Sequence, residues 1–473
     1  MFLDCSSLIA ENPPRPSNGI AVTDIDGDGA FELVVAGYRT ANLVLKWVDG
    51  RLVDVAGPLL ADPAGPALGL AAADIDGDGR EELYVVNCDR ATGSKDMADR
   101  LFACFGKHWI DLFAQAENAG AANHTAAGAV AAMDRWGHGR YGFLVATDGG
   151  PLRLYELTRR GRLEDGAEEA GLDSIGAARG VTALSIVSDH MDVVTVNDGG
   201  PNELFRNLGD GNFEEIAEER GIADSRPSGR AVVALDADGD GLFDLVVGTW
   251  DGAQRYFQQR MGGGFVEAAG ADFSMPGRIF TVVAADFDND GYEELFFHAH
   301  GEPNRLFGWR NDQWQELELG DAAEPKGLGT GAVAADIDGD GRLELILAHG
   351  SSGSSHGGHG SHGGGHGAEG SAQPLSVFRP EATNNGWLRV QPLTPFGAPA
   401  RGAVVSLTAG GRRQRRAVCA GSGYLCQGEP VAHFGLGPLH AVEQVEVRWP
   451  DGTVVTVDDP PADRLLIVPY PPE

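Results

Sequence analysis

Short apolar runs alternate with acidic, glycine-containing loops along most of the chain. Small apolar residues (Ala-Val-Ala-Ala) precede the loop that starts at Asp336, and a β-branched run (Leu-Val-Val) follows the loop that starts at Asp236. Two shorter segments, such as 202–207 and 213–215, complete the same kind of unit around a Gly-Asp-Gly turn. Short apolar runs bounded by Gly and Asp are typical of β-strands, so each unit predicts four strands.

The acidic loop recurs at an interval of about fifty residues. Its first Asp stands at positions 24, 74, 236, 286 and 336. The wider gap between 74 and 236 holds two decayed copies. One begins at Asp134 and keeps its glycines but loses the later acids, and the other, near Asp189, is shortened. The chain therefore contains seven units, each of which must pack on its neighbours to be stable.

Seven units of four strands predict an all-β fold, a seven-bladed β-propeller. Phe2-Leu3-Asp4 matches the fourth-strand pattern of 213–215, whereas the seventh unit stops after 375–378. We expect the N-terminal strand to complete the last blade and close the ring, which favours a propeller over an open solenoid. The propeller is expected to span residues 1–380, with a Gly- and His-rich insertion at 351–371, and a small β-rich domain to span 381–473.

The five intact loops carry carboxylates at positions 1, 3, 5 and 9, where they converge on one point, and position 7 can add a backbone carbonyl. Oxygen ligands at this density favour a hard cation, and a flexible ring of six or seven oxygens suits Ca²⁺ better than Mg²⁺. The predicted metal-binding residues are Asp24, Asp26, Asp28, Ala30 and Glu32; Asp74, Asp76, Asp78, Arg80 and Glu82; Asp236, Asp238, Asp240, Leu242 and Asp244; Asp286, Asp288, Asp290, Tyr292 and Glu294; and Asp336, Asp338, Asp340, Arg342 and Glu344.

These loops are not EF-hands, because position 12 is apolar and lies within a strand, where an EF-hand has a bidentate Glu. A single such loop could be a solvated acidic turn, but five copies at the same offsets favour metal binding. We expect about five Ca²⁺ sites with a structural role, and no binding at the decayed loops of Asp134 and Asp189. No nucleophile elbow, phosphate-binding loop or dinucleotide-binding motif is present, so the sequence predicts no catalytic residues.

Composition narrows the possible partners. The formal net charge of −33 argues against binding of nucleic acid or an anionic membrane, and no apolar run is long enough for membrane insertion. The N-terminus has neither the basic nor the apolar region of a signal peptide. If these loops bind Ca²⁺ as weakly as extracellular modules do, they would nonetheless be almost empty at the Ca²⁺ concentration of the cytosol. We therefore expect an extracellular, secreted or periplasmic location.

Three further features leave alternatives open. Imidazoles in the insertion (His356, His359, His362 and His366) could bind Zn²⁺ or Cu²⁺ weakly, although a simple polar loop is favoured. The basic cluster of Arg412, Arg413, Arg415 and Arg416 could dock the C-terminal domain on the acidic propeller or meet a sulfated glycan, but a solvated strand edge is favoured. The pairs Cys88/Cys104 and Cys419/Cys426 could form disulfides or remain thiols, and Cys5 makes the number odd.

The loops resemble the FG-GAP/VCBS repeats of integrin-type propellers. The C-terminal part resembles the ASPIC/UnbV domain, on the segments Asn385-Gly-Trp-Leu-Arg-Val, 421–437 and Val445-Glu-Val-Arg-Trp-Pro-Asp-Gly. Together with Phe273-Ser-Met-Pro and 372–379, they are similar to the cartilage acidic protein family. The resemblance implies a secreted, calcium-binding matrix or cell-surface protein. It also implies a signal peptide and an EGF-like module, which are not seen here, so the animal partners are not carried over.

The sequence thus favours a non-enzymatic, extracellular or cell-surface, Ca²⁺-stabilised propeller that acts in adhesion or protein recognition. We expect a protein partner, with a glycan as a further possibility, and a monomer. The alternative is an enzyme that acts on carbohydrate or lipid, with its site in the central mouth of the propeller.

Overall fold

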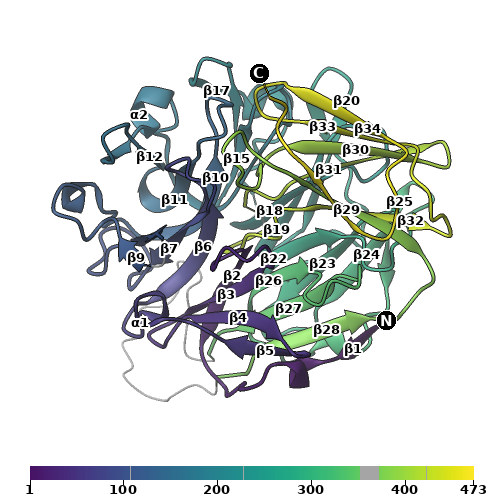
Figure 1. Cartoon of the computed structure of the whole chain (residues 1–473), viewed down its shortest axis with the longest axis horizontal. Helices are drawn as coiled ribbons and strands as arrows, with labels where there is room; N and C mark the ends of the chain where they lie inside the picture. Colours follow the sequence, from purple (N-terminus) through teal and green to yellow (C-terminus); the bar gives the residue numbers. More distant parts are fainter. Residues whose placement is uncertain (107, 227, 352–371, 422, 473) are drawn as a thin grey trace.

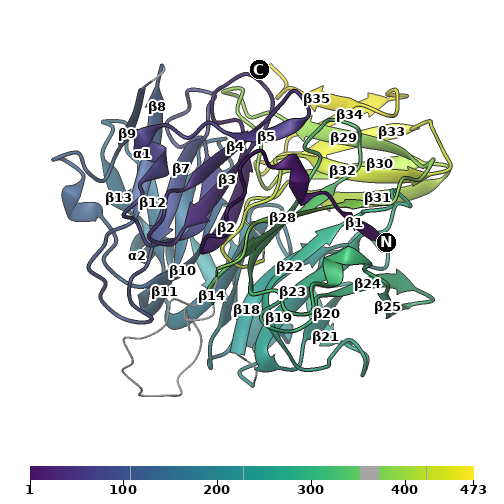
Figure 2. The ribbon, with the colours of Figure 1, turned by 90° about the horizontal axis from the view of Figure 1, so that it is seen from below.

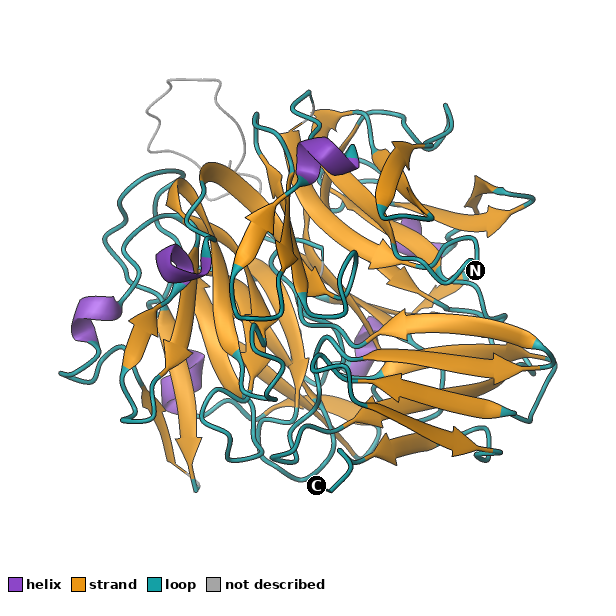
Figure 3. Ribbon diagram, turned by 90° about the horizontal axis from the view of Figure 1, so that it is seen from above, coloured by secondary structure: helices purple, strands orange, loops and turns teal. Residues whose placement is uncertain are grey.

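The structure is a computed structural model that describes residues 1–106, 108–226, 228–351, 372–421 and 423–472. Its elements are almost all strands, arranged as a ring of radiating sheets (Figure 1). The helical elements are single turns between strands (Figure 3): α1 (Pro58–Ala61), α2 (Ala167–Ala170), α3 (Ala217–Arg220), η1 (Ser6–Leu8), η2 (Ala119–Ala121) and η3 (Asp321–Ala323). The predicted all-β propeller is confirmed.

Seven four-stranded antiparallel blades form the ring within the described residues. Blade 1 contains β2 (Ser17–Thr23), β3 (Glu32–Gly37), β4 (Leu43–Val48) and β5 (Arg51–Asp54); blade 2, β6 (Ala67–Ala73), β7 (Glu82–Asn87), β8 (Arg100–Phe105) and β9 (His108–Asp111); blade 3, β10 (Ala127–Met133), β11 (Gly142–Pro151), β12 (Arg153–Leu157) and β13 (Leu163–Asp165). Blade 4 contains β14 (Ile175–Leu184), β15 (Asp192–Asn197), β16 (Glu203–Asn207) and β17 (Phe213–Glu215); blade 5, β18 (Ser228–Leu235), β19 (Asp244–Gly252), β20 (Arg255–Arg260) and β21 (Gly264–Glu267). Blade 6 contains β22 (Gly277–Ala285), β23 (Glu294–Ala299), β24 (Arg305–Arg310) and β25 (Gln313–Leu317); blade 7, β26 (Gly329–Ala335), β27 (Glu344–His349), β28 (Ser376–Pro380) and β1 (Phe2–Asp4).

The N-terminal strand closes the ring, as the repeat pattern predicts. Strand β1 pairs antiparallel with β28, with Phe2 opposite Pro380 and Asp4 opposite Phe378. The Phe2 side chain is 3% exposed and packs edge-to-face on Phe287 of blade 6 at a centroid distance of 5.0 Å. The two chain segments that form blade 7 therefore hold each other and also join blade 7 to blade 6.

The C-terminal part of the chain forms two sheets that lie against one side of the ring (Figure 2). One sheet has the order β32-β29-β35 and the other the order β31-β30-β33-β34. Their strands are β29 (Gly386–Pro392), β30 (Val404–Ala409), β31 (Arg412–Ala417), β32 (Ala432–Gly437), β33 (Gln444–Arg448), β34 (Val454–Asp458) and β35 (Leu465–Val468). A separate hydrophobic core, which includes Leu388, Val405 and Trp449, fills the space between them.

The connection between β31 and β32 runs through the centre of the propeller. We call residues 418–421 and 423–429 the plug. Its hydrogen bonds reach the first strands of blades 1 to 6: Ile20 and Val22, Ala72, Ala132, Thr182, Val232 and Thr281. Glu429 also accepts a hydrogen bond from the backbone N–H of Asp336, at the end of the first strand of blade 7. The plug therefore contacts every blade and satisfies polar groups that a hollow channel would leave to water.

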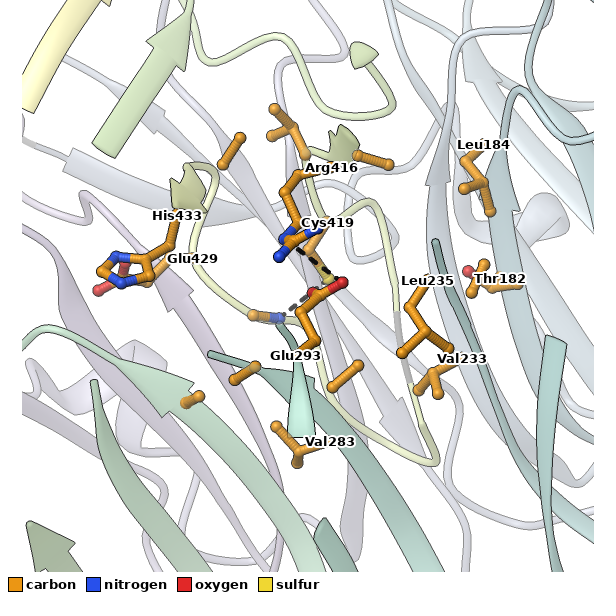
Figure 4. A pocket seen from close by; sticks show the side chains of 18 of the residues that line it. Thr182, Leu184, Val233, Leu235, Val283, Glu293, Arg416, Cys419, Glu429 and His433 are labelled. Carbon is orange, nitrogen blue, oxygen red and sulfur yellow. Dashed lines mark hydrogen bonds and ion pairs between the residues drawn. The ribbon is translucent and has the colours of Figure 1, made fainter. Parts of the chain in front are cut away.

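The plug lies in close contact with the inner strands at Gly19 and Gly331. A Cβ atom on Gly19 would lie 2.1 Å from the carbonyl oxygen of Leu425, and one on Gly331 would lie 2.9 Å from the sulfur of Cys426. A cavity of about 150 Å³ remains on one side of the plug, where Arg416 points at Glu293 between Thr182 and His433 (Figure 4). Over the described residues, the centre of the ring is thus a packed core with a small cavity in which the Arg416–Glu293 pair lies among mostly apolar side chains.

One buried ion pair joins the C-terminal part to blade 2. Arg401 is fully buried and forms a bidentate pair with Glu81, and it donates further hydrogen bonds to backbone carbonyls of the plug at Cys419 (2.8 Å) and Gly428 (3.1 Å). Because a buried charge is costly unless it is paired, each partner depends on the other.

Removal of the Phe2 ring should destabilise the protein by about 3 kcal/mol, the usual cost of truncating a buried Phe. Phe2→Ala, compared with the wild type by denaturant unfolding, measures this loss. Leu3→Ala is the matched control, because Leu3 lies in the same strand but is 53% exposed. Equal effects of the two substitutions would contradict the role of β1 in closing the ring.

Arg401→Met should cost about 3–5 kcal/mol, because it leaves the Glu81 carboxylate buried without a counter-charge. Arg413→Met should change the unfolding free energy by less than about 0.5 kcal/mol, since Arg413 lies on the surface of the same domain. Unfolding curves of both variants, recorded in parallel, check the difference. An Arg401→Met variant as stable as the wild type would contradict this role of the pair.

Candidate metal centres

Each intact acidic loop joins the first and second strands of a blade: β2 to β3, β6 to β7, β18 to β19, β22 to β23 and β26 to β27. In every one, three carboxylates place oxygen atoms within 4.8 Å of one another. The clusters are Asp24, Asp26 and Glu32; Asp74, Asp76 and Asp78; Asp236, Asp238 and Asp240; Asp286, Asp288 and Asp290; and Asp336, Asp338 and Glu344. The structure thus brings together three of the four predicted carboxylates per loop.

The first Asp of each loop organises the backbone around it. In blade 1, Asp24 accepts hydrogen bonds from the backbone N–H groups of Gly27 (2.7 Å) and Gly29 (2.8 Å). Both glycines have positive φ, at 77° and 90°, a conformation that glycine adopts without strain. Equivalent bonds recur in blades 2 and 7. The Gly spacing is therefore a requirement of the loop's turn.

The acid at position 9 folds back over the loop. Glu32 accepts a hydrogen bond from the backbone N–H of Ile25, and Glu82, Glu294 and Glu344 make the same contact in blades 2, 6 and 7, at 2.8–3.1 Å. In blade 5 the shorter Asp244 instead accepts from the Tyr256 hydroxyl, at 2.7 Å. In Glu82 and Glu294 one oxygen is thus held by the backbone and the other can face a cation. The other oxygen of Asp244 accepts from the backbone N–H of Gln259, and those of Glu32 and Glu344 contact Lys46 and Arg379.

The residues at position 7 remain a prediction as carbonyl ligands. Their backbone N–H groups donate to the Asp at position 5, at 2.8–2.9 Å, in all five loops: Ala30, Arg80, Leu242, Tyr292 and Arg342. This bond fixes the turn at that point in each loop.

Burial makes these loops unfavourable for negative charge when no cation is present. Burial, with neighbouring carboxylates adding to it, raises the pKa of Glu82 to about 9. Burial likewise raises the pKa of Glu344 to about 8, despite the opposing guanidinium of Arg379, and that of Asp286 to about 7. In the same loops Asp236 Oδ1, Asp286 Oδ1 and Glu294 Oε1 are buried without a hydrogen-bond partner in the described part of the chain. Buried oxygens of this kind fit a bound hard cation.

The decayed loops are held by the protein's own groups. Asp134 keeps the backbone contacts of a first-position Asp, with His138 and Gly139, but no second acid follows it. In blade 4, Asp192 accepts hydrogen bonds from three consecutive backbone N–H groups, those of Ile186, Val187 and Ser188. Neither Asp134 nor Asp189 belongs to a three-acid cluster in the residues that the structure describes.

The interpretation of the basic cluster as a solvated edge is wrong for three of its four residues. Arg412 and Arg416 donate to the carbonyl of Gly291, at 2.9 and 3.1 Å, and Arg415 donates to that of Gly241. Arg416 also pairs with Glu293 at 3.3 Å. Of the four, only Arg413 is solvated, with its side chain 63% exposed. The cluster therefore docks the C-terminal sheets on blades 5 and 6.

Two other open questions have different outcomes. No disulfide links the five cysteines in the described structure, and Cys88, Cys104 and Cys426 are buried. The histidines of the insertion, and with them the predicted Zn²⁺ or Cu²⁺ site, lie outside the described residues.

No helix in the described ranges is long and apolar enough to cross a membrane.

Comparisons with known proteins agree with this architecture. The model of FG-GAP-like repeats matches residues 24–85, 189–247 and 236–297, and the model named ASPIC and UnbV matches 396–473. Cartilage acidic protein 1 of Xenopus tropicalis is 43% identical over 98% of this chain and 75% of its own length. The proteins of that name from Mus musculus and Homo sapiens are each 42% identical, over 97% and 94% of this chain and 75% and 70% of their own lengths.

Fold and loops together define an FG-GAP-repeat β-propeller with a C-terminal ASPIC/UnbV domain. At this identity and coverage, the chain belongs to the cartilage acidic protein family.

Stability of the metal-free protein should fall as the pH rises. Because burial raises the pKa of Glu82 and Glu344 above their ordinary 4.5, protonation of these acids favours the folded state. That contribution is complete below about pH 4.5 and is lost as the pH rises through about 8 and 9. Melting temperatures in chelator should therefore decrease from pH 5 to pH 9. Saturating Ca²⁺ should remove most of the decrease, since a bound cation favours the ionised acids. Identical pH profiles with and without Ca²⁺ would contradict this.

Proposed function

We propose that this protein is a non-enzymatic, calcium-binding extracellular or cell-surface protein that acts in adhesion or protein recognition. Ca²⁺ would stabilise five loops of a propeller that spans residues 1–380 and supports a C-terminal domain at 381–473. The observation that carries the proposal is the five-fold repetition of an oxygen-only cluster, each with three carboxylates within 4.8 Å.

The position of the loops supports a structural role for the ion. Asp286 Oδ2 accepts a hydrogen bond from the backbone N–H of Gly435, and Asp336 Oδ2 pairs with Arg389, at 3.0 and 2.8 Å. Asn385 donates to the carbonyl of Asp288 at 2.8 Å. The acidic loops of blades 6 and 7 are thus the surface on which the C-terminal domain rests. An ion that fixes the shape of these loops also fixes the docking of that domain.

The centre of the ring favours this proposal over an enzyme. The plug occupies the channel, and the cavity beside it measures about 150 Å³, less than the roughly 300 Å³ of a small ligand site. His433 lines that cavity, but burial lowers its pKa to about 3, and its Nε2 is bonded to Asn289 at 2.6 Å. A neutral, hydrogen-bonded imidazole between the C-terminal domain and blade 6 is consistent with a packing role.

Calcium availability supports a location outside the cytoplasm. Extracellular modules bind Ca²⁺ with a Kd of roughly 10⁻⁴–10⁻³ M, so at about 10⁻⁷ M free Ca²⁺ each loop would be occupied on the order of 0.1% of the time. Buried carboxylates without a cation, such as Glu82 in blade 2 and Asp236 in blade 5, would then destabilise the ring. The net charge of −33 favours a protein partner over nucleic acid. Because three of the four clustered arginines are engaged with the propeller, the cluster gives little support to a glycan site.

Calcium should raise the melting temperature relative to chelator. A site occupied at about ten times its Kd contributes ~1.4 kcal/mol, so five sites amount to several kcal/mol. Melts in EDTA and in millimolar Ca²⁺, with Mg²⁺ at equal concentration as the control, test the effect. Metal analysis at saturation should count five Ca²⁺ per chain. An unchanged melting temperature, or no bound Ca²⁺, would overturn the proposed function.

A further inference from the structure

One position of the third strand faces the acidic loop in every metal-candidate blade. The strand registers pair Leu33 with Leu45, Leu83 with Phe102, Leu245 with Phe257, Leu295 with Phe307 and Leu345 with Phe378. Antiparallel strands run in opposite directions, so one step forward on the third strand lies opposite one step back on the second strand. The residue one step back from each of these Leu residues is the position-9 acid. The third-strand residues opposite these acids are Lys46, Ala103, Gln258, Gly308 and Arg379 in blades 1, 2, 5, 6 and 7.

In blade 1 this residue places a positive charge inside the cluster. The Lys46 ammonium lies 2.5 Å from Asp26 Oδ2, 2.7 Å from Asp28 Oδ2 and 3.0 Å from Glu32 Oε1. All three donors of the ammonium can therefore be used on three different carboxylates. Its side chain is only 18% exposed. The ammonium is a cation held at the place where the carboxylates converge.

In blade 7 the protein supplies even more positive charge. Arg379 pairs with Asp338 through Nη2 and with Glu344 through Nε, both at 2.6 Å. Two other arginines reach the remaining acids: Arg389 pairs with Asp336 at 2.8 Å, and Arg342 pairs with Asp340. Every carboxylate of this loop thus has a guanidinium partner.

Blades 2 and 5 have no such partner. Within the described part of the chain, no Lys or Arg nitrogen lies within 4.0 Å of the acids at positions 1, 3, 5 and 9 of these two loops; in blade 2, Arg401 pairs with Glu81 at position 8 instead. Blade 6 is intermediate, with Arg310 3.1 Å from Asp290. In blade 5 the opposing residue is Gln258, whose neutral amide donates to Asp238 at 2.5 Å. Asp236 Oδ1 of the same loop is buried without a hydrogen-bond partner. The nearest arginine contact to this loop is that of Arg415 with the backbone carbonyl of Gly241, so its four carboxylates have no direct cationic partner among the described residues.

We propose that the side chain opposite the position-9 acid sets the Ca²⁺ affinity of each blade, with Lys46 and Arg379 acting as tethered counter-ions that compete with the metal. Blades 2 and 5 then fill at the lowest Ca²⁺ concentration, and blades 1 and 7 at the highest. This inference rests on the proposed function, because it grades sites that must first bind Ca²⁺. It also gives blades 1 and 7 a way to keep their loops folded when Ca²⁺ is scarce.

A reciprocal exchange between blades 1 and 5 tests the inference. Lys46→Gln gives blade 1 the amide of blade 5, and Gln258→Lys gives blade 5 the ammonium of blade 1. Calorimetric titration of the full chain with Ca²⁺, with metal analysis at fixed free Ca²⁺, should show one more tight site in Lys46→Gln and one fewer in Gln258→Lys. We expect each altered site to shift by at least about tenfold in Kd, since a unit charge at contact distance acts directly on the ion. Lys46→Arg is the control, because it keeps the charge, and its number of tight sites should not change.

Melting in EDTA supplies a second readout. Without Ca²⁺, Lys46→Gln should melt below the wild type, because blade 1 loses its counter-ion, and Gln258→Lys should melt at or above it. This measurement also shows that each variant folds. If the wild type binds Ca²⁺ and both exchanges leave the number of tight sites and the order of melting unchanged, the inference is overturned and the proposed function stands. If the wild type binds no Ca²⁺, the proposed function itself fails.

Discussion

Negative charge collected at one face of the ring is the constraint on which the rest of the structure depends. A propeller that repeats an acidic loop in five blades must compensate buried carboxylates in each of them. Backbone N–H groups of the loops compensate part of this negative charge. The C-terminal domain compensates another part through Arg389, which pairs with Asp336 of blade 7, and Arg401, which pairs with Glu81 of blade 2. The two domains are therefore electrostatically dependent on each other. A propeller of this sequence without its C-terminal domain would expose the Glu81 carboxylate and an open channel.

Local periodicity was sufficient to predict the ring. A loop that repeats about every fifty residues requires repeated blades, and the short pattern of Phe2-Leu3-Asp4 identified the strand that completes the last one, where β1 pairs with β28. The acids were predictable for the same reason, because their spacing of two residues on a tight Gly turn determines convergence. What spacing could not show is which three of the four carboxylates come together. The position-9 Glu joins the cluster in blades 1 and 7, where Lys46 and Arg379 contact it, whereas the three Asp residues form the cluster in blades 2, 5 and 6.

The plug could not be predicted from any local pattern, because its contacts join residues hundreds of positions apart, such as Gln427 with Ala72. One signal was nonetheless present. Five residues before the loop that follows each first strand, which begins at Ser185 in blade 4, all seven units have Gly, Ala or Thr: Gly19, Gly69, Ala129, Gly180, Ala231, Thr281 and Gly331. A bulge or register irregularity falls at this point in every first strand. Small residues at the same place in every blade indicate that something packs against the inner strands. The prediction for the arginine cluster was wrong for a related reason. Strand β31 is an edge strand of its own sheet, but this edge packs against the propeller, which the sequence did not indicate.

Repetition explains why one loop design can be compensated in several ways. Each blade inherits the same acids, but its surroundings differ, because the C-terminal domain covers some loops and leaves others to their own blade. Blade 7, which contacts that domain through Asp336, is the blade in which guanidinium groups reach all four acids. Blade 1 is served by Lys46 from its own third strand. A charge built into the chain is present at every Ca²⁺ concentration, whereas an ion is present only above its Kd. In the neighbouring blades 7 and 1 the position-9 acid has a cationic group within 3.0 Å, whereas in blade 6 the nearest guanidinium is 3.9 Å away. Under the proposed grading, blade 7, where the N-terminal strand meets β28, and the adjacent blade 1 are the parts of the propeller least dependent on bound metal.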